Sequence, residues 1–218
     1  MNAQPALGIA ATVVSVNVGR PQLIDTARGT VASAIWKTAV TGRVGVRGVN
    51  LDGDDQADRS VHGGPDKAVY AYAIEDVRAW QRELGRDLGT AAFGENLTTQ
   101  DLDVSGAVIG ERWQIGTVLL EVAQPRLPCF KLRLRIGEPG FLKRFARASR
   151  PGAYLRIVGE GDLGAGDRID VVSRPDHGVT VRLVADALLL DPKLIPVAVA
   201  APQLPPDLRD WLADRAPG

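Results

Sequence analysis

Gln124-Pro125-Arg126-Leu127-Pro128-Cys129-Phe130-Lys131-Leu132 is the stretch around which the chain is organised, and it holds the single cysteine among 218 residues. Pro125 and Pro128 restrict the backbone ahead of the thiol, because each proline ring fixes φ at about −65°. Arg126 and Lys131 flank Cys129, and nearby cations lower the pKa of a thiol from its ordinary value of about 8.5. The stretch therefore predicts a thiol in a positively charged setting.

Two local structures fit this stretch. Pro128 is a favourable first residue of a helix, which would place Cys129 in the first turn, where the helix dipole favours an anion. Residues 130–136 also alternate between apolar and polar, as in a strand. In a strand, Cys129 would share one face with three cations, Lys131, Arg133 and Arg135. The alternative without function is a buried structural cysteine, since a free thiol packs as a small hydrophobe.

Short strands dominate the sequence on both sides of the cysteine. Alternation and valine content predict strands at 12–18, 31–40, 43–46, 68–72, 112–115, 118–123, 153–158 and 167–172. Gly116 and Thr117 form the turn of a hairpin whose second strand leads into the cysteine stretch. Many short strands with glycine turns are typical of a barrel or a sandwich, and the last two strands would close a barrel.

Helical periodicity occurs in three places. Apolar residues at 74, 77, 80 and 84 predict an amphipathic helix that ends at Gly85, with Trp80 in the core. Phe141, Leu142 and Phe145 also have helical spacing. After the linker at 175–178 the pattern is helical only, with Thr180 as the first cap and further helices near Pro192 and after Leu204.

The two patterns predict a barrel domain at 1–174 and a linker with a small three-helix domain at 175–218. About forty residues are too few for a large core of their own, so we expect the second unit to dock on the first. His177 has no partner at metal-ligand spacing and is interpreted as a solvated linker residue.

Composition excludes several classes of function. The formal net charge is zero and the isoelectric point is about 6.7, which gives no bulk electrostatic case for binding nucleic acid or an anionic membrane. One cysteine excludes an intrachain disulfide and fits a reducing compartment. The N-terminus lacks the basic region of a signal peptide, and no segment reaches the ~20 apolar residues of a membrane span. We expect a cytoplasmic protein.

Residues 52–58 partly imitate a calcium loop. Ala57 stands where such a loop requires glycine, and Gly63 stands where it requires glutamate. The calcium interpretation is therefore rejected, and a solvated acidic loop is expected.

Two glycine-bearing loops supply further candidate residues. His62, Gly63 and Gly64 form a loop in which backbone N–H groups can face an anion, and Lys67 follows it directly. The second loop, at 93–99, carries an acceptor at Glu95 and an amide with both donor and acceptor at Asn96, next to Gly94. By themselves both loops are compatible with plain turns.

These motifs together resemble the MOSC family, the molybdenum-cofactor-binding β-barrels. The resemblance covers most of residues 12–172 and is carried by the cysteine stretch 124–132, the stretch 59–72, and the stretches 93–99 and 109–116. The bacterial branch that the chain most resembles carries a C-terminal three-helix domain and reduces N-hydroxylated bases.

The resemblance implies a mainly β fold with α-helices, namely a mostly antiparallel β-barrel plus the helical domain. It implies a molybdenum cofactor, a Mo-pyranopterin, with the Cys129 thiolate as metal ligand and catalytic residue, which suits a soft redox metal. It further implies a set of cofactor-binding residues: His62, Gly63, Gly64, Lys67, Gly94, Glu95, Asn96, Thr98, Arg126 and Lys131. The implied partners are a small N-hydroxylated substrate such as 6-hydroxylaminopurine and an electron-donor protein, whereas the oligomeric state is not predicted.

Three other functions remain open at this point. A cofactor carrier or sulfur-transfer module would hold a persulfide on Cys129 and use the same motifs. A cysteine hydrolase would need His62 within hydrogen-bonding reach of Cys129, and no third orienting group is evident. A scaffold without chemistry would leave the cations around Cys129 unexplained.

Overall fold

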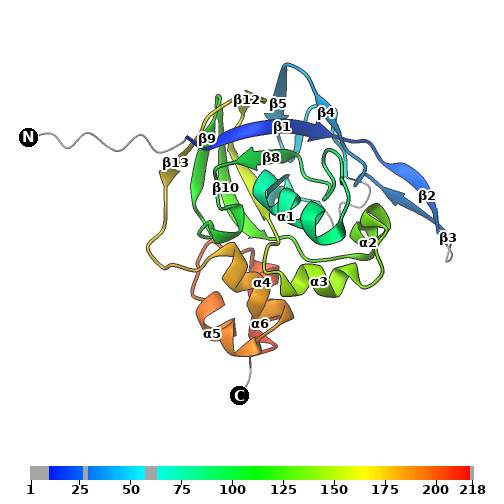
Figure 1. Cartoon of the computed structure of the whole chain (residues 1–218). Helices are drawn as coiled ribbons and strands as arrows, with labels where there is room; N and C mark the ends of the chain where they lie inside the picture. The colour runs from blue at the N-terminus through cyan, green and yellow to red at the C-terminus, as the bar shows by residue number, and fades with distance from the viewer. Residues whose placement is uncertain (1–9, 27–28, 57–62, 217–218) are drawn as a thin grey trace, which may run out of the picture.

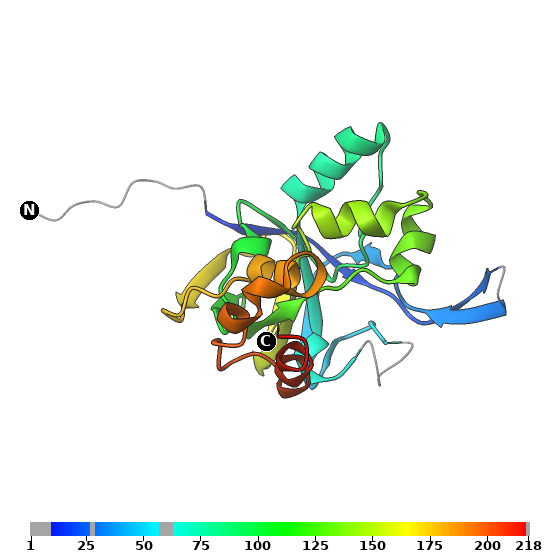
Figure 2. The same cartoon turned by 90° about the horizontal axis from the view of Figure 1, so that it is seen from below.

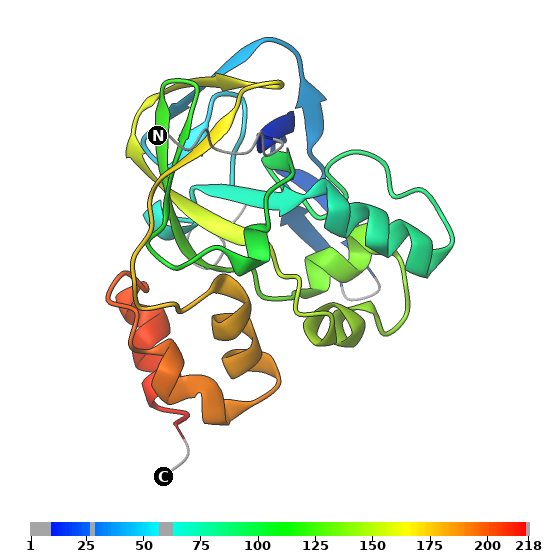
Figure 3. The same ribbon diagram turned by 60° about the vertical axis from the view of Figure 1, so that its left-hand side comes forward.

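A computed structural model describes residues 10–26, 29–56 and 63–216 of the chain (Figure 1). His62, Asp58 and Ala57 lie outside these ranges. A curved sheet forms the upper part of the molecule, and helices cover one side and the lower end (Figures 1 and 3).

Eight strands form the main sheet, in the order β13-β9-β10-β11-β7-β8-β1-β4. Only the pair β7–β8 is parallel, and helix α1 connects these two strands. The predicted mainly β fold with α-helices, mostly antiparallel, is thus confirmed. The strands are β1 (Thr12–Val18), β4 (Thr38–Val40), β7 (Val69–Ala73), β8 (Leu97–Gln100), β9 (Arg112–Ile115), β10 (Val118–Pro125), β11 (Ala153–Gly159) and β13 (Ile169–Ser173).

The start of β1 and the segment that leads into β13, from opposite sides of this sheet, meet along a short seam. Backbone hydrogen bonds of 2.9 Å and 2.8 Å join Val13 to Asp167 and Gly166, and Ile169 N–H donates to the Ala11 carbonyl over 2.8 Å. Thr12 and Arg168 form an isolated antiparallel bridge there, while β1 and β13 form no ladder in the described chain. The sheet curls round on itself at this seam but is not a closed barrel.

Two smaller sheets flank the main one. β5 (Arg43–Arg47) lies between β12 (Gly161–Gly164) and β6 (Asn50–Leu51), and β2 (Gln22–Thr26) pairs with β3 (Gly29–Ser33) in a ribbon that projects from the body (Figure 2). The predicted single strand at 31–40 is wrong at its centre: β3 ends at Ser33 and β4 begins at Thr38. Ser33 Oγ accepts a hydrogen bond from Ile35 N–H over 3.3 Å, and Lys37 turns inward to a buried carboxylate, so residues 34–37 leave the ladder.

Three helices pack on one side of the sheet through an aromatic cluster. They are α1 (Ile74–Leu84), α2 (Phe130–Ile136) and α3 (Phe141–Arg147). Trp80 of α1 is fully buried among Phe93, Phe141 and Phe145, and its indole N–H donates to the Tyr72 hydroxyl over 2.9 Å. Gly85 ends α1 in the left-handed conformation, as the sequence predicts. The cluster fixes α2, and hence the residue at its start, against β7.

The C-terminal helices pack under the sheet. They are α4 (Val181–Leu189), α5 (Ile195–Ala198) and α6 (Pro206–Ala213), and the short 3₁₀ segment η3 (Pro192–Leu194) leads into α5. Two further 3₁₀ segments, η1 (Pro65–Lys67) and η2 (Val104–Gly106), lie earlier in the chain. Thr180 caps α4, because its hydroxyl accepts the Leu183 N–H over 3.1 Å. Val181, Val184 and Leu212 belong to the same apolar core as the sheet. The predicted division into domains at residue 174 remains a prediction.

His177 is half-buried, so its interpretation as a solvated linker residue is wrong. Its Nδ1 accepts the Val179 N–H over 3.0 Å, which leaves Nε2 as the protonated nitrogen. Nε2 lies 3.1 Å from the Ile109 carbonyl and 3.2 Å from Gln203 Oε1. The imidazole therefore ties the connecting segment to the sheet and to the C-terminal helices. None of the described helices is long and apolar enough to cross a membrane.

Candidate functional site

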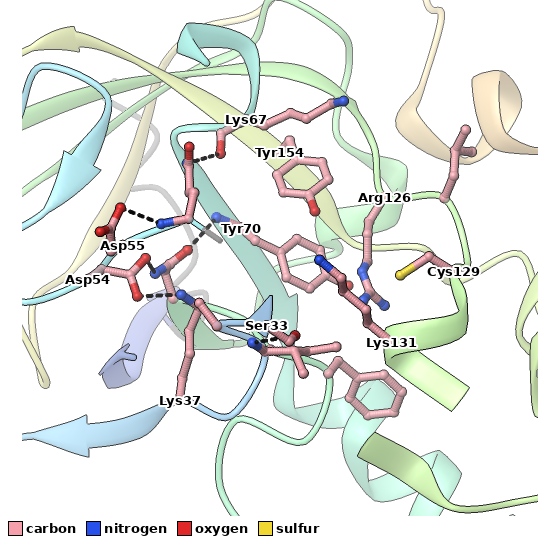
Figure 4. A pocket seen from close by; sticks show the side chains of 17 residues that line it. Ser33, Lys37, Asp54, Asp55, Lys67, Tyr70, Arg126, Cys129, Lys131 and Tyr154 are labelled. Atoms are coloured by element: carbon pink, nitrogen blue, oxygen red, sulfur yellow. Dashed lines mark hydrogen bonds and ion pairs between the residues drawn. The ribbon is translucent and has the colours of Figure 1, made fainter. Parts of the chain in front are cut away.

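A pocket of about 100 Å³, open to solvent on one side, lies where residues 33–37, the loop after β6, β7 and the end of β10 converge (Figure 4). Six predicted site residues line it, although they are far apart in the sequence: Lys67, Gly94, Asn96, Arg126, Cys129 and Lys131. Strand pairing explains the convergence, because β7 lies between β8 and β11, and β11 pairs with β10, which leads to Arg126 and Cys129.

Cys129 stands at the N-cap of α2. The helical alternative for the cysteine stretch is thus the right one, but the helix begins at Phe130 and Pro128 precedes it. Cys129 has an extended backbone, and its carbonyl accepts the N–H groups of Leu132 and Arg133 over 3.0 Å and 3.3 Å. The side chain is half-buried at the pocket wall, so the thiol is accessible to a ligand in the pocket.

Arg126 is a buried cation beside that thiol (Figure 4). Only 5 % of the residue is exposed, and its guanidinium carbon lies 5.4 Å from the Tyr70 ring centre and 6.0 Å from that of Phe145. It also forms a hydrogen bond with Tyr154. One of its terminal nitrogens, Nη1, is buried without a hydrogen-bond partner in the described chain. Because an unpaired buried donor on a charged group is costly, this atom indicates an anionic or acceptor ligand.

Two tyrosines complete the wall beside Arg126. Tyr70 on β7 and Tyr154 on β11 are direct partners across the sheet, with ring centres 5.1 Å apart. Burial raises the pKa of both hydroxyls, which are therefore protonated at neutral pH. Tyr70 donates to the Pro151 carbonyl over 2.8 Å. Tyr154 accepts from Arg126 and retains its own proton for a ligand.

The acidic loop is exposed at Asp52 and Gly53, as predicted, but not at Asp54. The Asp54 side chain is 2 % exposed and forms an ion pair with Lys37, which is itself buried. Asp54 also accepts the Gly19 N–H and the Asn96 side-chain amide, each over 2.8 Å. Burial lowers the pKa of Lys37, and the Asp54 carboxylate opposes that change. Asp54 thereby joins β1, the segment 34–37 and the 93–99 loop at one edge of the pocket.

Asn96 and Gly94 shape the floor of the pocket. Both amide protons of Asn96 are used inside the protein, towards Asp54 and the Asn17 carbonyl, and Oδ1 accepts the Tyr70 N–H over 3.1 Å. A ligand could therefore reach Asn96 only through the second lone pair of Oδ1. Gly94 has a φ of +75°, and a Cβ there would lie 2.6 Å from Ile35 Cγ1, so the close contact of this loop with Ile35 requires glycine.

Glu95 and Thr98 lie below the pocket surface and do not line it. Glu95 is 1 % exposed and accepts hydrogen bonds from Phe93 N–H over 3.0 Å and from the Thr98 hydroxyl over 3.1 Å. Burial raises the pKa of Glu95 to about 7, although these hydrogen bonds and the charge of Arg126 oppose the change. The two residues support the floor and can reach a ligand only through their neighbours.

Lys67 stands at the rim, whereas the glycines before it lie outside the pocket. Gly64 has a φ of +89° and caps η1, and neither Gly63 nor Gly64 contributes to the lining. Burial lowers the pKa of Lys67, and Asp66 and Asp207 oppose this change. Asp207 belongs to α6, so the C-terminal helices lie within electrostatic reach of the rim. His62 lies outside the described residues, and its role stays a prediction.

The sequence analysis missed several residues of this site: Lys37, Asp54, Asp55, Gln56, Tyr70 and Tyr154 all line the pocket. Gln56 donates through its amide to the Lys67 carbonyl over 3.2 Å, while its Oε1 is buried without a partner in the described chain. The rarity of lysine was the one signal in the sequence that could have indicated Lys37, because the chain has only five lysines and three of them line this pocket. The pocket lining thus combines a thiol with four cations and two carboxylates, and its residues include one buried donor and one buried acceptor without a partner in the described chain.

The described residues of the pocket lining contain no set of side chains that could hold a metal by itself. No group of three or more His, Cys, Asp or Glu side chains with metal-binding geometry occurs within residues 10–26, 29–56 and 63–216. A metal bound to Cys129 would take its other ligands from outside the described residues, as the metal of an organic cofactor does.

The chain is similar to several known proteins. A MOSC domain is recognised over residues 58–170. The chain belongs to the MOSC domain family. Protein YiiM of Escherichia coli is 35% identical over 156 residues, which cover 70% of this chain and 69% of that protein. A protein of Gibberella moniliformis named Reductase is 36% identical over 151 residues, which cover 67% of this chain but only 27% of that protein.

The fold agrees with that of a solved member. The crystal structure of YiiM from Geobacillus stearothermophilus superposes with a TM-score of 0.78 at 27% identity, covering 95% of this MOSC chain and all of the other. The agreement extends over the C-terminal helices, because so little of either chain is left outside the superposition.

Replacing Lys37 by methionine should lower the free energy of unfolding by about 3 kcal/mol, because removing one partner of a buried ion pair leaves the other charge uncompensated. Lys143→Met is the matched control, since Lys143 is exposed and the change there should stay within about 0.5 kcal/mol. Urea denaturation of both variants measures the difference. Equal losses would show that the Lys37–Asp54 pair does not stabilise the fold.

The raised pKa of Glu95 predicts a pH-dependent stability. Protonated Glu95 binds its proton more tightly in the native state than in the unfolded chain, where glutamate has its ordinary pKa of 4.5. The stabilisation that this proton gives to the folded state is therefore complete below pH 4.5 and is lost as the pH rises to about 7. Relative to the Glu95→Gln variant, the free energy of unfolding of the wild type should fall by up to roughly 3 kcal/mol across that pH interval. Denaturation curves at several pH values measure it, and parallel profiles for the two proteins would contradict the assignment.

Proposed function

We propose that this protein is a molybdenum-cofactor-dependent reductase of N-hydroxylated compounds such as 6-hydroxylaminopurine, acting in the cytoplasm. The observation that carries the proposal is the accessible Cys129 thiol beside a buried guanidinium that has an unpaired nitrogen. Membership of the MOSC family and the similarity to a protein named Reductase support it.

The pocket fits an anionic cofactor with a soft metal. Cys129 would be the protein's ligand to molybdenum, because a thiolate suits that metal. Arg126, with Lys37, Lys67 and Lys131 around it, would offset the negative charge of thiolate, dithiolene or phosphate. The unpaired Oε1 of Gln56 and Nη1 of Arg126 offer one acceptor and one donor to a polar ring or to the substrate.

When bound, the molybdenum cofactor supplies the two-electron chemistry of the reaction. The chain's own residues supply orientation and protons. Reduction of R–NH–OH takes up two electrons and two protons, breaks the N–O bond and releases R–NH₂ and water. Tyr154, whose hydroxyl keeps its proton at neutral pH and is held by Arg126, would donate a hydrogen bond to the departing oxygen of a substrate bound in the pocket.

Cys129→Ser should abolish reduction of 6-hydroxylaminopurine while leaving the fold intact. A serine hydroxyl is nearly the size of the thiol but does not ionise near neutral pH, so stability should fall by no more than about 1 kcal/mol. The measurement is the rate with an artificial electron donor, together with molybdenum content, for both proteins made in a host that synthesises the cofactor.

Equal rates per bound molybdenum in wild type and Cys129→Ser would show that Cys129 is not the working ligand. Molybdenum-free wild-type protein from such a host would instead favour the sulfur-transfer module, with a persulfide on Cys129.

A further inference from the structure

The chain is neutral as a whole, but its charge is unevenly distributed. Residues 126–150 contain eight arginines and lysines and a single acid, Glu138. Arg126 and Lys131 belong to the pocket. The remaining cations of this segment lie on or next to α2 and α3.

α1, α2 and α3 form one helical face of the molecule (Figures 2 and 3). Arg86, just after α1, donates to the Ile136 carbonyl at the end of α2. Arg144 of α3 forms a 2.8 Å ion pair with Glu83 of α1. The three helices are thus tied together, and we call their solvent-exposed side the helical face.

Three acids on the helical face form ion pairs with its arginines, whereas two exposed acids, Glu75 and Asp87, have no ion pair among the described residues and accept hydrogen bonds from Asp101, Gln81 and Gly89. Glu83 pairs with Arg144 and, over 3.7 Å, with Arg150, and Glu138 pairs with Arg144 over 3.7 Å. Asp76 lies 4.0 Å from Arg150. Five exposed cations on the three helices have no ion pair in the described part of the chain: Arg78, Arg82, Arg133, Lys143 and Arg147. The helical face therefore presents net positive charge to solvent.

This positive surface adjoins the pocket. Cys129 caps α2, and the next residue, Phe130, exposes 43 % of its surface. Arg133 lies one turn further along the same helix. An exposed aromatic residue surrounded by charged ones is the composition of a protein-binding surface, with an apolar centre and a polar rim.

We propose that the helical face docks an acidic electron-carrier protein that reduces the Cys129 pocket. This inference rests on the proposed function, which consumes two electrons per N–O bond broken. The single cysteine cannot supply them as a dithiol, so a separate reductant must be oxidised by two electrons in each turnover, with two protons taken up and water released. Charge complementarity selects an acidic carrier, because opposite charges steer encounter and orient the partner.

The test uses a reduced flavodoxin, an acidic flavoprotein, as probe, and reduced methyl viologen as a small positively charged donor. The variant reverses charge on the helical face: Arg133→Glu, Lys143→Glu and Arg147→Glu. The matched control reverses three exposed cations elsewhere: Arg168→Glu, Lys193→Glu and Arg215→Glu. Binding of labelled flavodoxin to cofactor-free protein is measured by fluorescence anisotropy, and turnover by 6-hydroxylaminopurine reduction.

The variant should weaken flavodoxin binding and flavodoxin-driven turnover at least about tenfold, and raising the salt from about 50 to about 500 mM should weaken the wild type similarly. The control variant should bind flavodoxin and turn over with it as the wild type does. Turnover driven by methyl viologen should be the same for all three proteins. Wild-type binding that is absent or insensitive to the charge reversal overturns the proposal, as does tighter binding of a DNA duplex or an anionic vesicle than of flavodoxin. Loss of turnover with methyl viologen in the wild type would instead overturn the proposed function.

Discussion

The pocket depends on a permanently charged guanidinium held inside the protein. Arg126 sits at the end of β10, between the rings of Tyr70 and Phe145, and one of its nitrogens has no internal partner. Burying such a group is costly unless the charge is paired. The fold bears this cost through a rigid aromatic cluster and the Tyr70–Tyr154 pair across β7 and β11, which together hold the guanidinium at the pocket wall.

The second constraint is the buried carboxylate of Asp54. It receives hydrogen bonds from three separate parts of the chain, at Gly19, Lys37 and Asn96. Because these donors come from three segments, the pocket edge is fixed without any regular secondary structure at residues 34–37. A positive charge at Lys37 is thereby retained near the ligand space, alongside Arg126. Lys37 and Asp54 compensate each other's charge and make this edge rigid, whereas Arg126, Lys67 and Lys131 make the site electropositive.

Local patterns predicted the elements well where a single periodicity dominates. The hairpin at 112–123, the helix that ends at Gly85 and the Thr180 cap all depend on neighbouring residues, and all are present. The grouping of Lys67, Asn96, Arg126 and Cys129 came from the family resemblance, because the strand order that joins them is a long-range property. Whether they bind the cofactor is still a prediction.

What the sequence could not show is the identity of buried polar partners. Asp54 stands in an acidic run that has the composition of a solvated loop, and nothing local distinguishes it from Asp52 or Asp55. Lys37 lies in a stretch with the alternation of a strand, yet it breaks that strand by turning inward. His177 has no metal-ligand spacing, and its hydrogen bonds to Ile109 and Gln203 arise only once the C-terminal helices pack against the sheet.

The central claim is that the Cys129 thiolate binds molybdenum, and X-ray absorption at the molybdenum edge tests it most directly. Spectra are recorded on cofactor-loaded wild-type protein and on a Cys129→Ala variant loaded in the same host. The account predicts that the metal in the variant has one sulfur neighbour fewer than in the wild type, because the dithiolene sulfurs remain and the protein's sulfur is lost. An identical sulfur shell in both proteins would contradict it.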